Sequence, residues 1–574
     1  MADLQKYRGK RKLFILAAMA LLLLVAVISV AAIVRSQKKS NAVAGELVVR
    51  STCAKTLYPD LCFSTVKAAT AATATELADL KNPREVLLTA LNYTIYTVER
   101  NYFTVKKIAA GRDLTKREKA ALRDCLEMID DTLEELRESE SELRNFGFKN
   151  YTIADHKENL MTLLSAAQTN QGSCIDGFSH DDADRKVRKA LIAGQNHVFR
   201  LVSNILAIIK HLKDSELVII SSAAANSSDS PGRRLGENRS DWPKWLSAGD
   251  RRLLQSTTVT ADVTVAADGS GNYRTVSEAV AAAPSGSSRR YVIRIKAGVY
   301  RENVEIPRSK TNLMFVGDGR TTTIITANRN VVDGSTTFRS ATVAVVGGGF
   351  LARDITFQNA AGPSKHQAVA LRVNADLCAF YRIDVLGYQD SLYVHSLRQF
   401  YSGSLIAGTV DFIFGNAEAV LQDCDIHARR PNSGQRNMVT AQGRSDPNEN
   451  TGIVIHRCRI GATSDLRSAA AGSVETYLGR PWKEYSRTVV MRSEISNVIH
   501  PAGWYEWSGD FAKETLYYAE YQNTGAGAAT GGRVNWPGVR RQISAAEAQQ
   551  FTAGRFIGGG NWLPATGFPH TLGL

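Results

Sequence analysis

The segment 380–417, "FYRIDVLGYQDSLYVHSLRQFYSGSLIAGTVDFIFGNA", decides the fold class. Its short apolar runs alternate with Gly, Asp and Ser, and "FYRIDVLGYQ" from 380 is followed by the related "FYSGSLIAGT" from 400. Similar segments begin at residues 350, 420 and 453: "FLARDITFQN", "VLQDCDIHAR" and "IVIHRCRIGA". An internal repeat of roughly 20–30 residues predicts a solenoid. Short strands without intervening helices favour a parallel β-helix, with a β-sandwich as the alternative.

Two aspartates lie within otherwise apolar stretches of this segment. "LGYQDSLYVHS" (386–396) reads as a strand but carries Gln389 and Asp390, and "GTVDFIFGNA" (408–417) reads as a strand that carries Asp411. Burial of an unpaired carboxylate is costly. Each carboxylate is therefore expected to have a partner or a role.

The spacing of these residues matches one coil of a β-helix. Asp390 and Asp411 are 21 residues apart, and Gln367 and Gln389 are 22 apart. Neighbouring strands lie about 4.8 Å apart, so the three segments would stack on one face. Arg480 follows Asp411 by 69 residues, which predicts a position about three coils further on.

Two close carboxylates titrate unequally, because one charge disfavours the other. One can stay protonated as an acid while its partner, held by an arginine, stays ionised. The competing interpretation is that both are coil-edge aspartates with structural hydrogen bonds.

Residues 13–34 form a run of 22 apolar, uncharged residues. As a helix this run spans about 33 Å, enough for a hydrocarbon core of about 30 Å. Five basic residues precede it, which predicts a cytoplasmic tail at 1–12: Lys6, Arg8, Lys10, Arg11 and Lys12. The length favours an uncleaved transmembrane signal-anchor over a cleaved signal peptide. Either way, the rest of the chain is expected in the secretory pathway.

Residues 45–215 and 216–256 differ in character. Apolar residues recur at helical spacing in 84–108, 116–143 and 185–212, which predicts an antiparallel helical bundle over 45–215. Residues 216–256 are small and polar, as in a linker. They contain "RRLG" at 233–236 and "RRLL" at 251–254, which are candidate processing sites or solvated linker charges. The β-rich region then runs over 257–574.

Seven cysteines are present, four of them before residue 180. In a secretory domain these four predict two disulfides, with three possible connectivities: Cys53, Cys62, Cys125 and Cys174. Four glycosylation sequons also lie before residue 241: Asn92, Asn150, Asn226 and Asn238.

The 574-residue chain has a net charge of +14 and a pI near 9.4. This charge predicts an acidic partner, such as a nucleic acid, an anionic membrane or an acidic polysaccharide. Nothing in the sequence resembles a nucleic-acid module. The sequence holds no HExxH, Cys-x-x-Cys or G-x-S-x-G motif, so no metal or cofactor is implied and a serine α/β-hydrolase is disfavoured.

Five motifs resemble the plant pectin methylesterases in their order and spacing, across essentially all of 257–560. They are "GVYRENV" (298–304), "QAVALR" (367–372), "GYQDSLY" (387–393), "DFIFGNA" (411–417) and "LGRPW" (478–482). "CAKTLYPDLC" (53–62) and "TNQGSCIDGF" (169–178) resemble the pectin methylesterase and invertase inhibitor domain. The resemblance implies a type I enzyme with a right-handed parallel β-helix catalytic domain after a four-helix, inhibitor-like pro-region. It also implies hydrolysis of methyl esters in homogalacturonan to pectate and methanol, in the cell wall and without a cofactor.

The same resemblance assigns site residues. Asp411 matches the nucleophile, and Asp390 matches the group that protonates methanol and then activates water. Gln389 and Gln367 match the oxyanion donors, and Arg480 matches the residue that orients Asp411. The remaining matches are substrate contacts at Thr337 and Trp482, beside Gln367 and Arg480, and cleft-shaping residues at Tyr388 and Phe412.

Further expectations follow from the resemblance. It implies disulfides between Cys53 and Cys62 and between Cys125 and Cys174. Many relatives carry a cysteine where this chain has Ser404, so Cys424 is expected to be a free, buried thiol. Processing at "RRLL" would release a mature wall enzyme that starts near 255–258, and the pro-region would inhibit it or aid its folding until then. Proteinaceous inhibitors are possible further partners.

Two other functions are compatible with parts of this pattern. One is a polygalacturonase or lyase on the same fold, which needs carboxylate clusters or a calcium site instead. The other is a binding or inhibitory protein with an inert β domain. The complete set of two Gln, two Asp and one Arg argues against both.

Overall fold

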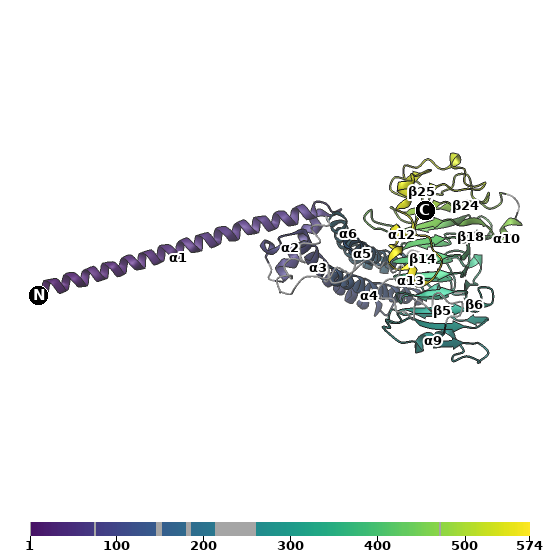
Figure 1. The fold of residues 1–574 in the computed structure, drawn as a ribbon, viewed down its shortest axis with the longest axis horizontal. Helices are drawn as coiled ribbons and strands as arrows, with labels where there is room; N and C mark the ends of the chain where they lie inside the picture. Colours follow the sequence, from purple (N-terminus) through teal and green to yellow (C-terminus); the bar gives the residue numbers. More distant parts are fainter. Residues whose placement is uncertain (1, 74–75, 145–151, 179–184, 213–259, 470–471) are drawn as a thin grey trace, which may run out of the picture.

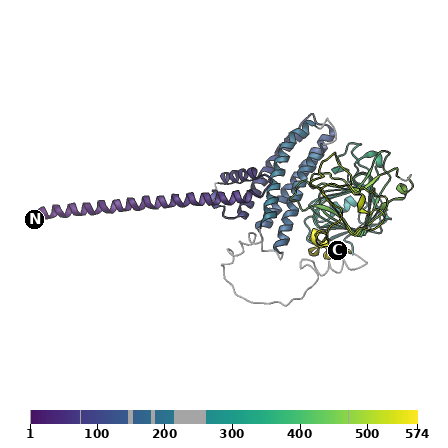
Figure 2. The ribbon, with the colours of Figure 1, turned by 90° about the horizontal axis from the view of Figure 1, so that it is seen from above.

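The computed structural model describes residues 2–73, 76–144, 152–178, 185–212, 260–469 and 472–574. A long N-terminal helix leads into a helical bundle, and the bundle leans against the side of a β-helix (Figure 1). Seen from above, the bundle helices stand beside the β-helix coils (Figure 2). The candidate processing sites and three sequons, Asn150, Asn226 and Asn238, lie outside the described residues. Asn92 is exposed on its helix.

Three parallel sheets form the β-helix, which confirms the predicted fold class. The first sheet holds β1 (Val263–Val265), β2 (Tyr291–Ile295), β5 (Leu313–Gly317), β8 (Leu351–Arg353), β11 (Cys378–Tyr381), β14 (Arg398–Ser402), β17 (Glu418–Gln422), β20 (Gly452–His456), β23 (Arg487–Met491), β25 (Tyr517–Tyr521) and β26 (Val539–Arg540). The second holds β3 (Gly298–Arg301), β6 (Thr323–Ala327), β9 (Thr356–Asn359), β12 (Asp384–Leu386), β15 (Leu405–Gly408), β18 (Asp425–Ala428), β21 (Arg459–Ala462) and β24 (Glu494–Ile495). The third, here called the cleft sheet, holds β4 (Val304–Ile306), β7 (Val343–Val345), β10 (Leu371–Asn374), β13 (Leu392–Ser396), β16 (Ile413–Gly415), β19 (Asn437–Gln442) and β22 (Thr476–Gly479).

The sequence repeat has a direct structural cause. The repeated segments that begin at residues 350, 380, 400, 420 and 453 contribute to β8, β11, β14, β17 and β20, which are consecutive neighbours in the first sheet. After most of these strands, one residue turns the chain toward the second sheet with a positive φ, as at Asp354, Arg382 and Asp423. Inward aliphatic and aromatic side chains, such as Phe315, Phe350 and Phe380, fill the interior. The short helix α9 (Val276–Ala282) lies at the N-terminal end of the stack, and α10 (Ser464–Arg467) lies in the connection between β21 and β22. The helices α11 (Ala545–Gln549), α12 (Ala553–Phe556) and α13 (Leu563–Thr566) pack on the outer face of the first sheet.

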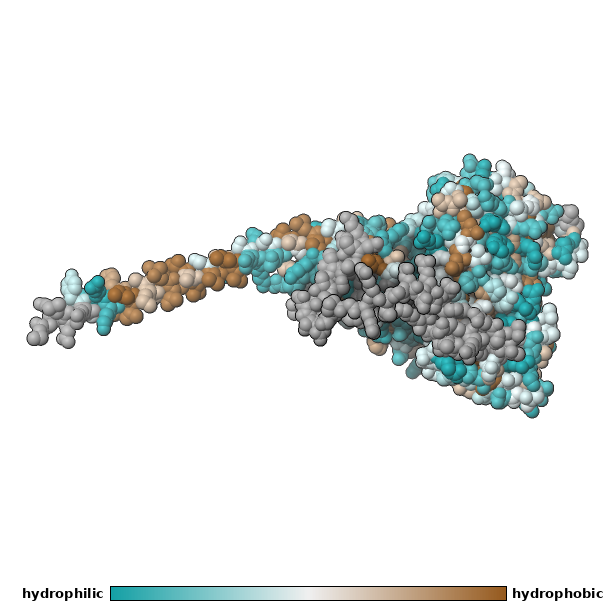
Figure 3. Space-filling model, viewed as in Figure 1, coloured by the Kyte–Doolittle hydropathy of each residue, from teal (hydrophilic) through white to brown (hydrophobic). Residues whose placement is uncertain are grey.

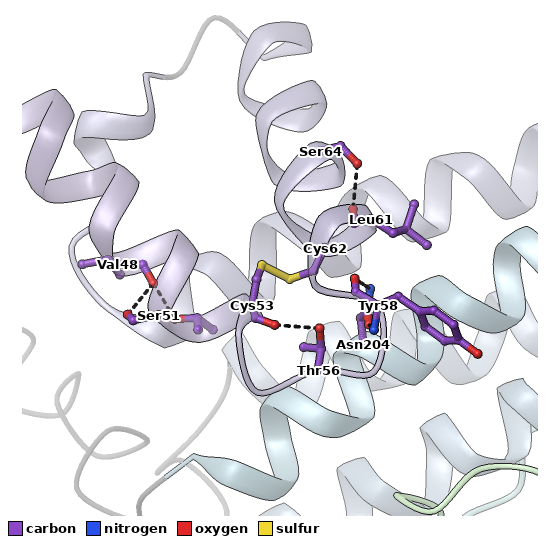
Figure 4. The surroundings of a disulfide bond; sticks show 10 residues. Val48, Ser51, Cys53, Thr56, Tyr58, Leu61, Cys62, Ser64 and Asn204 are labelled. Carbon is purple, nitrogen blue, oxygen red and sulfur yellow. Dashed lines mark hydrogen bonds between the residues drawn. A yellow bond between two sulfur atoms is a disulfide. The ribbon is translucent and has the colours of Figure 1, made fainter.

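The bundle is built from four long helices, as predicted: α3 (Pro83–Ala109), α4 (Lys116–Arg144), α5 (Ile153–Asp176) and α6 (Arg185–His211). Ahead of them lie α1 (Ala2–Cys53) and α2 (Pro59–Ala72). Disulfides join Cys53 to Cys62 and Cys125 to Cys174, the two pairs that the resemblance implied. The first closes the turn between α1 and α2 (Figure 4).

The N-terminal helix α1 projects away from the rest of the chain, and its apolar residues are exposed (Figure 3). By length and composition it can cross a membrane, and a signal sequence near the N-terminus would pass the same test. Exposed leucine and isoleucine side chains over such a length need a lipid or protein environment.

Candidate active site

Asp390 and Asp411 occupy turns, not strands. The expectation of carboxylates inside two strands was wrong, because β13 begins at Leu392 and β16 at Ile413, two residues after each aspartate. Both aspartates have positive φ, 63° at Asp390 and 50° at Asp411. Aspartate tolerates this left-handed region better than most residues, and such conformations cluster at functional sites.

The pairing of β13 with β16 places the two carboxylates one above the other, as the spacing predicted. Leu392 pairs with Ile413 in parallel register, and the backbone N–H of Asp390 donates to the carbonyl of Val410 at 3.0 Å. Neighbouring strands lie about 4.8 Å apart. Asp390 and Asp411 are both buried, at 7% and 6% exposure.

Arg480 holds Asp411 with a two-pronged ion pair. Its Nε donates to Oδ1 at 2.8 Å, and its Nη2 donates to Oδ2 at 2.6 Å. This fork geometry fixes the orientation of both carboxylate oxygens. Arg480 follows β22, which is two coils beyond β16. The expected three coils were wrong, because the intervening coils are longer: Ile413 pairs with Thr440, and Thr440 pairs with Gly479.

The two aspartates have different electrostatic surroundings. Burial raises the pKa of Asp390 well above its usual range, the charge of Asp411 raises it further, and Arg480 opposes both effects. Burial lowers the pKa of Arg480, but the contact with Asp411 outweighs this and leaves that pKa raised. The site therefore pairs Asp390, whose surroundings favour its neutral form, with Asp411, whose side chain a guanidinium holds in place.

Both carboxylates line a cavity of about 510 Å³, together with Thr337, Gln367 and Gln389. Within the described part of the chain, neither glutamine amide makes a side-chain hydrogen bond with another protein group. Both amides are thus free to donate to an oxyanion in the cavity. Every residue predicted for catalysis or substrate contact lines this one cavity, Arg480 and Trp482 included.

The aromatic floor of the cavity differs from the prediction. Phe412 packs inside the β-helix, and Tyr388 stacks under Arg429 away from the cavity, with 3.9 Å from Cζ of Arg429 to the ring centroid. Tyr393 and Phe414 form the floor instead, with ring centroids 4.1 Å apart. Phe412 and Phe414 are two residues apart and would share one face of a continuous strand. Phe412 instead lies between the turn at Asp411 and the start of β16, so it packs inward while Phe414 of β16 faces the cavity.

Trp482 and Trp507 form one wall of the cavity. Trp482 makes an edge contact with Phe414 at 5.9 Å between ring centroids. Arg480 lies over the ring of Trp507, with 4.4 Å from Cζ to the centroid. Flat aromatic faces beside a floor of aromatics suit the apolar faces of sugar rings. Trp507 was not singled out from the sequence, which gave no signal that distinguished it from a core tryptophan.

The helical bundle covers the cavity from the other side. Arg117 and Asp124 of α4 and Ser173 and Asp176 of α5 line the same space as Asp390 and Asp411. Lys483 donates to Asp176 at 2.7 Å. The bundle therefore lies directly on the face of the β-helix that carries these groups.

Further polar contacts join the bundle to the β-helix beyond the cavity. Ser203 of α6 donates to Asp446 at 2.5 Å, and Thr162 of α5 donates to Glu418 at 2.6 Å. His395 is buried, and its Nε2 lies 3.0 Å from the hydroxyl of Ser173.

The thiol of Cys424 is free and buried, as expected from Ser404. Ser404 itself is buried, and its hydroxyl donates to the carbonyl of Ser402 at 2.9 Å. Backbone hydrogen bonding thus replaces any covalent link at this corner.

The comparison with known proteins decides the family. The model of the family described as "Pectinesterase" matches residues 262–561, and that of "Plant invertase/pectin methylesterase inhibitor" matches residues 48–208. The chain belongs to the pectinesterase family. It is 59% identical to "Pectinesterase 1" of Citrus sinensis, over 99% of this chain and 96% of that protein. It is 58% identical to "Pectinesterase/pectinesterase inhibitor 3" of Arabidopsis thaliana, over 99% and 98%.

A solved pectinesterase structure covers the β-helix alone. "Pectin methylesterase from Carrot" is 73% identical, with a TM-score of 0.55, and covers 56% of this chain and 100% of that one. A β-helix of this family therefore folds without a helical bundle attached.

Proposed function

We propose that this pectinesterase cleaves methyl esters of homogalacturonan through an acyl-enzyme on Asp411. The observation that carries the proposal is the forked ion pair between Arg480 and Asp411 beside the buried acid Asp390, all in one cavity. Family membership makes the chain a carboxylic ester hydrolase that acts on pectin. The geometry supports the assignment of a role to each side chain.

In the first half-reaction, a carboxylate oxygen of Asp411 attacks the ester carbonyl carbon. The amides of Gln367 and Gln389 donate to the resulting oxyanion, and one such donor contributes about 3–4 kcal/mol in the transition state. The bond to the methoxy oxygen breaks, and Asp390 gives its proton to the departing methanol. A mixed anhydride between Asp411 and the galacturonate remains.

In the second half-reaction, Asp390 is a carboxylate and accepts a proton from water. The water oxygen attacks the galacturonate carbonyl of the anhydride, and the bond to Asp411 breaks. The Asp411 carboxylate returns to Arg480, Asp390 is again protonated, and a free galacturonate leaves. Thr337 and Trp482 position the sugar next to these groups.

The test separates an esterase from an enzyme that cuts the polymer. A fragment of residues 255–574 is incubated with highly methylated pectin, and methanol release and polymer length are both measured. We expect methanol release with no change in polymer length. A shortened polymer would show glycosidic cleavage, and a folded fragment that releases no methanol would refute the proposal.

The helical bundle is proposed to keep the cleft closed in the precursor, since it lines the same cavity as the catalytic groups. Cleavage at "RRLL" (251–254) would then separate the β-helix from the bundle and from the N-terminal helix. That helix is proposed to anchor the precursor in the membrane of the secretory pathway, and the mature enzyme would act in the cell wall. Separate inhibitor proteins of the same helical family are proposed to dock on the same face.

Docking of the bundle is expected to weaken as pH rises. Glu418 accepts from Thr162 of α5, and burial raises its pKa to about 8, although Arg398 opposes the shift. An exposed glutamate titrates near about 4.3, so the docked state holds a proton that the undocked state releases. Docking therefore is strongest below the undocked pKa and is lost progressively as pH rises toward the docked value.

This pH dependence is measured as the Kd between the separated bundle and the β-helix fragment at pH 5 and pH 8. We expect a Kd at least about tenfold higher at pH 8, which corresponds to one unit of pKa difference. Glu418→Gln, which stays neutral, should flatten the dependence. An equally steep dependence in Glu418→Gln would show that other groups carry it.

A further inference from the structure

The outward side chains of the cleft sheet form a ladder that continues past the catalytic coil. Arg372 of β10 pairs in register with Tyr393 of β13, and Tyr393 pairs with Phe414 of β16. The aromatic floor of the cavity therefore ends in a guanidinium one coil away. Coils are about 4.8 Å apart, comparable to the length of one sugar unit, so each rung can face a successive residue of a polymer laid along the ladder.

Two more arginines extend this line along the same side. Arg339 lies in the short helical turn Phe338–Ser340 before β7, and Arg308 follows β4. β7 and β4 are the next two strands after β10 in the cleft sheet. Arg372, Arg339 and Arg308 thus form an arginine row that leads away from Asp390 one coil at a time.

Helix α4 places a carboxylate on each member of the arginine row. Asp124 and Glu127 bind Arg339, with N–O distances of 2.5 and 2.6 Å. Asp131 binds Arg308 at 2.5 Å. The three acids are spaced by three and four residues, so they share one face of the helix.

Arg372 is the most enclosed member of the row. It is 3% exposed and lies over the ring of Phe338, with 3.4 Å from Cζ to the centroid. Its Nε has no hydrogen-bond partner in the described part of the chain, and its nearest carboxylate, Glu127, is 3.9 Å away. A buried guanidinium with an unused donor is costly unless a ligand completes it.

When the bundle is removed, the row loses all three of these carboxylates. On the β-helix itself, Glu305 is the acid whose charge acts on both Arg339 and Arg372. Asn374 accepts from Arg372 at 2.8 Å but is neutral. One carboxylate does not balance three guanidinium groups, so the open cleft presents net positive charge along this side.

We propose that the arginine row binds the free carboxylates of galacturonates that have already lost their methyl groups. In the precursor, the three acidic side chains of α4 occupy the positions of these carboxylates. This inference rests on the proposed function. Arginine recognises planar carboxylates with paired donors. The enzyme would therefore favour a methyl ester that lies next to free acids on the Arg372 side.

The experiment measures kcat/KM of the 255–574 fragment on highly methylated pectin and on partially de-esterified pectin of the same length. Wild type is compared with Arg339→Gln and Arg372→Gln. Arg459→Gln is the matched control, because Arg459 is an exposed arginine paired with Asp425 on the second sheet. Arg339 is one-third exposed, so its variant tests the row even if Arg372→Gln fails to fold.

We expect the wild type and the control to favour the partially de-esterified pectin. In each row variant that preference should fall by about tenfold, the effect of one lost charge-assisted hydrogen bond, through a rise in KM on that substrate alone. Unchanged preference together with weaker binding of the bundle would overturn the inference and leave the row as a docking surface only. No methanol from either substrate in the wild type would instead refute the proposed function.

Discussion

Replacement of Asp390 by Asn lowers kcat for methanol release by about 10²–10⁴-fold, the usual contribution of a general acid–base group. The amide keeps the shape of the neutral acid but cannot give a proton to methanol or take one from water. The side chain is already buried and favours its neutral form, so the β-helix should stay folded. The measurement is steady-state methanol release at saturating pectin, with circular dichroism as the check on folding.

The control for this variant is Asp423→Asn. Asp423 is an exposed aspartate that pairs with Arg457 outside the cavity, and its loss should change kcat by less than about twofold, since isolated surface pairs contribute little. Activity in Asp390→Asn within a few fold of wild type would remove Asp390 from the mechanism.

The pH dependence of methanol release tests the same role of Asp390 as a general acid. The first half-reaction needs the protonated form of Asp390, whose pKa burial and the Asp411 charge raise. Activity should therefore fall as pH rises through the pKa of Asp390, and the fall should be absent from the residual activity of Asp390→Asn.

The second large effect concerns the uncleaved precursor. Ser203→Asp is expected to raise the rate of methanol release by the precursor by about 10²–10³-fold. Ser203 is fully buried and donates to the carboxylate of Asp446, so the variant sets two carboxylates against each other at the interface. An uncompensated buried charge costs about 3–5 kcal/mol, which shifts the docking equilibrium toward the open cleft by a comparable factor.

The measurement is methanol release by the full chain with an intact linker, beside the same chain carrying Ser64→Asp. Ser64 is an exposed serine of α2 whose hydroxyl donates to the carbonyl of Leu61 in the same helix (Figure 4). We expect Ser203→Asp to approach the activity of the 255–574 fragment and Ser64→Asp to stay low. Equal, high activity in the wild-type precursor would show that the bundle does not close the cleft.

The fold could be predicted because a β-helix requires a sequence pattern that repeats with each coil. Each coil needs inward apolar residues in short strands. The repeated segments that begin between residues 350 and 453 therefore resemble one another and lie on neighbouring strands of one sheet. The regular 21-residue spacing placed Asp390 and Asp411 on adjacent coils. The coil count to Arg480 was wrong because the connections between β18 and β19, between β19 and β20, and between β21 and β22 are longer than the corresponding connections around Asp390 and Asp411. Inserted loops change the length of a coil without changing the stack.

The local conformation of the carboxylates was harder to predict. "LGYQDSLYVHS" has strand composition throughout, and the turn at Gln389 and Asp390 has no glycine or proline of its own to reveal it. A positive φ at aspartate depends on the tertiary framework, which the sequence pattern does not contain. The same is true of the choice between Phe412 and Phe414 for the cavity floor, because it depends on where the turn at Asp411 ends and β16 begins.

The docking of the bundle left no local signal. Asp124, Glu127 and Asp131 look like the solvated face of an amphipathic helix in isolation. Only their arrangement opposite Arg339 and Arg308 shows that they are interface residues.

The most direct test of the mechanism is methanol release from highly methylated pectin by the 255–574 fragment and by its Asp411→Ala variant. Removal of the nucleophile should leave no release above the uncatalysed background, while β-rich circular dichroism shows that the variant is folded. Release by the wild type and none by the variant is the predicted result. Substantial release by folded Asp411→Ala would contradict the acyl-enzyme on Asp411.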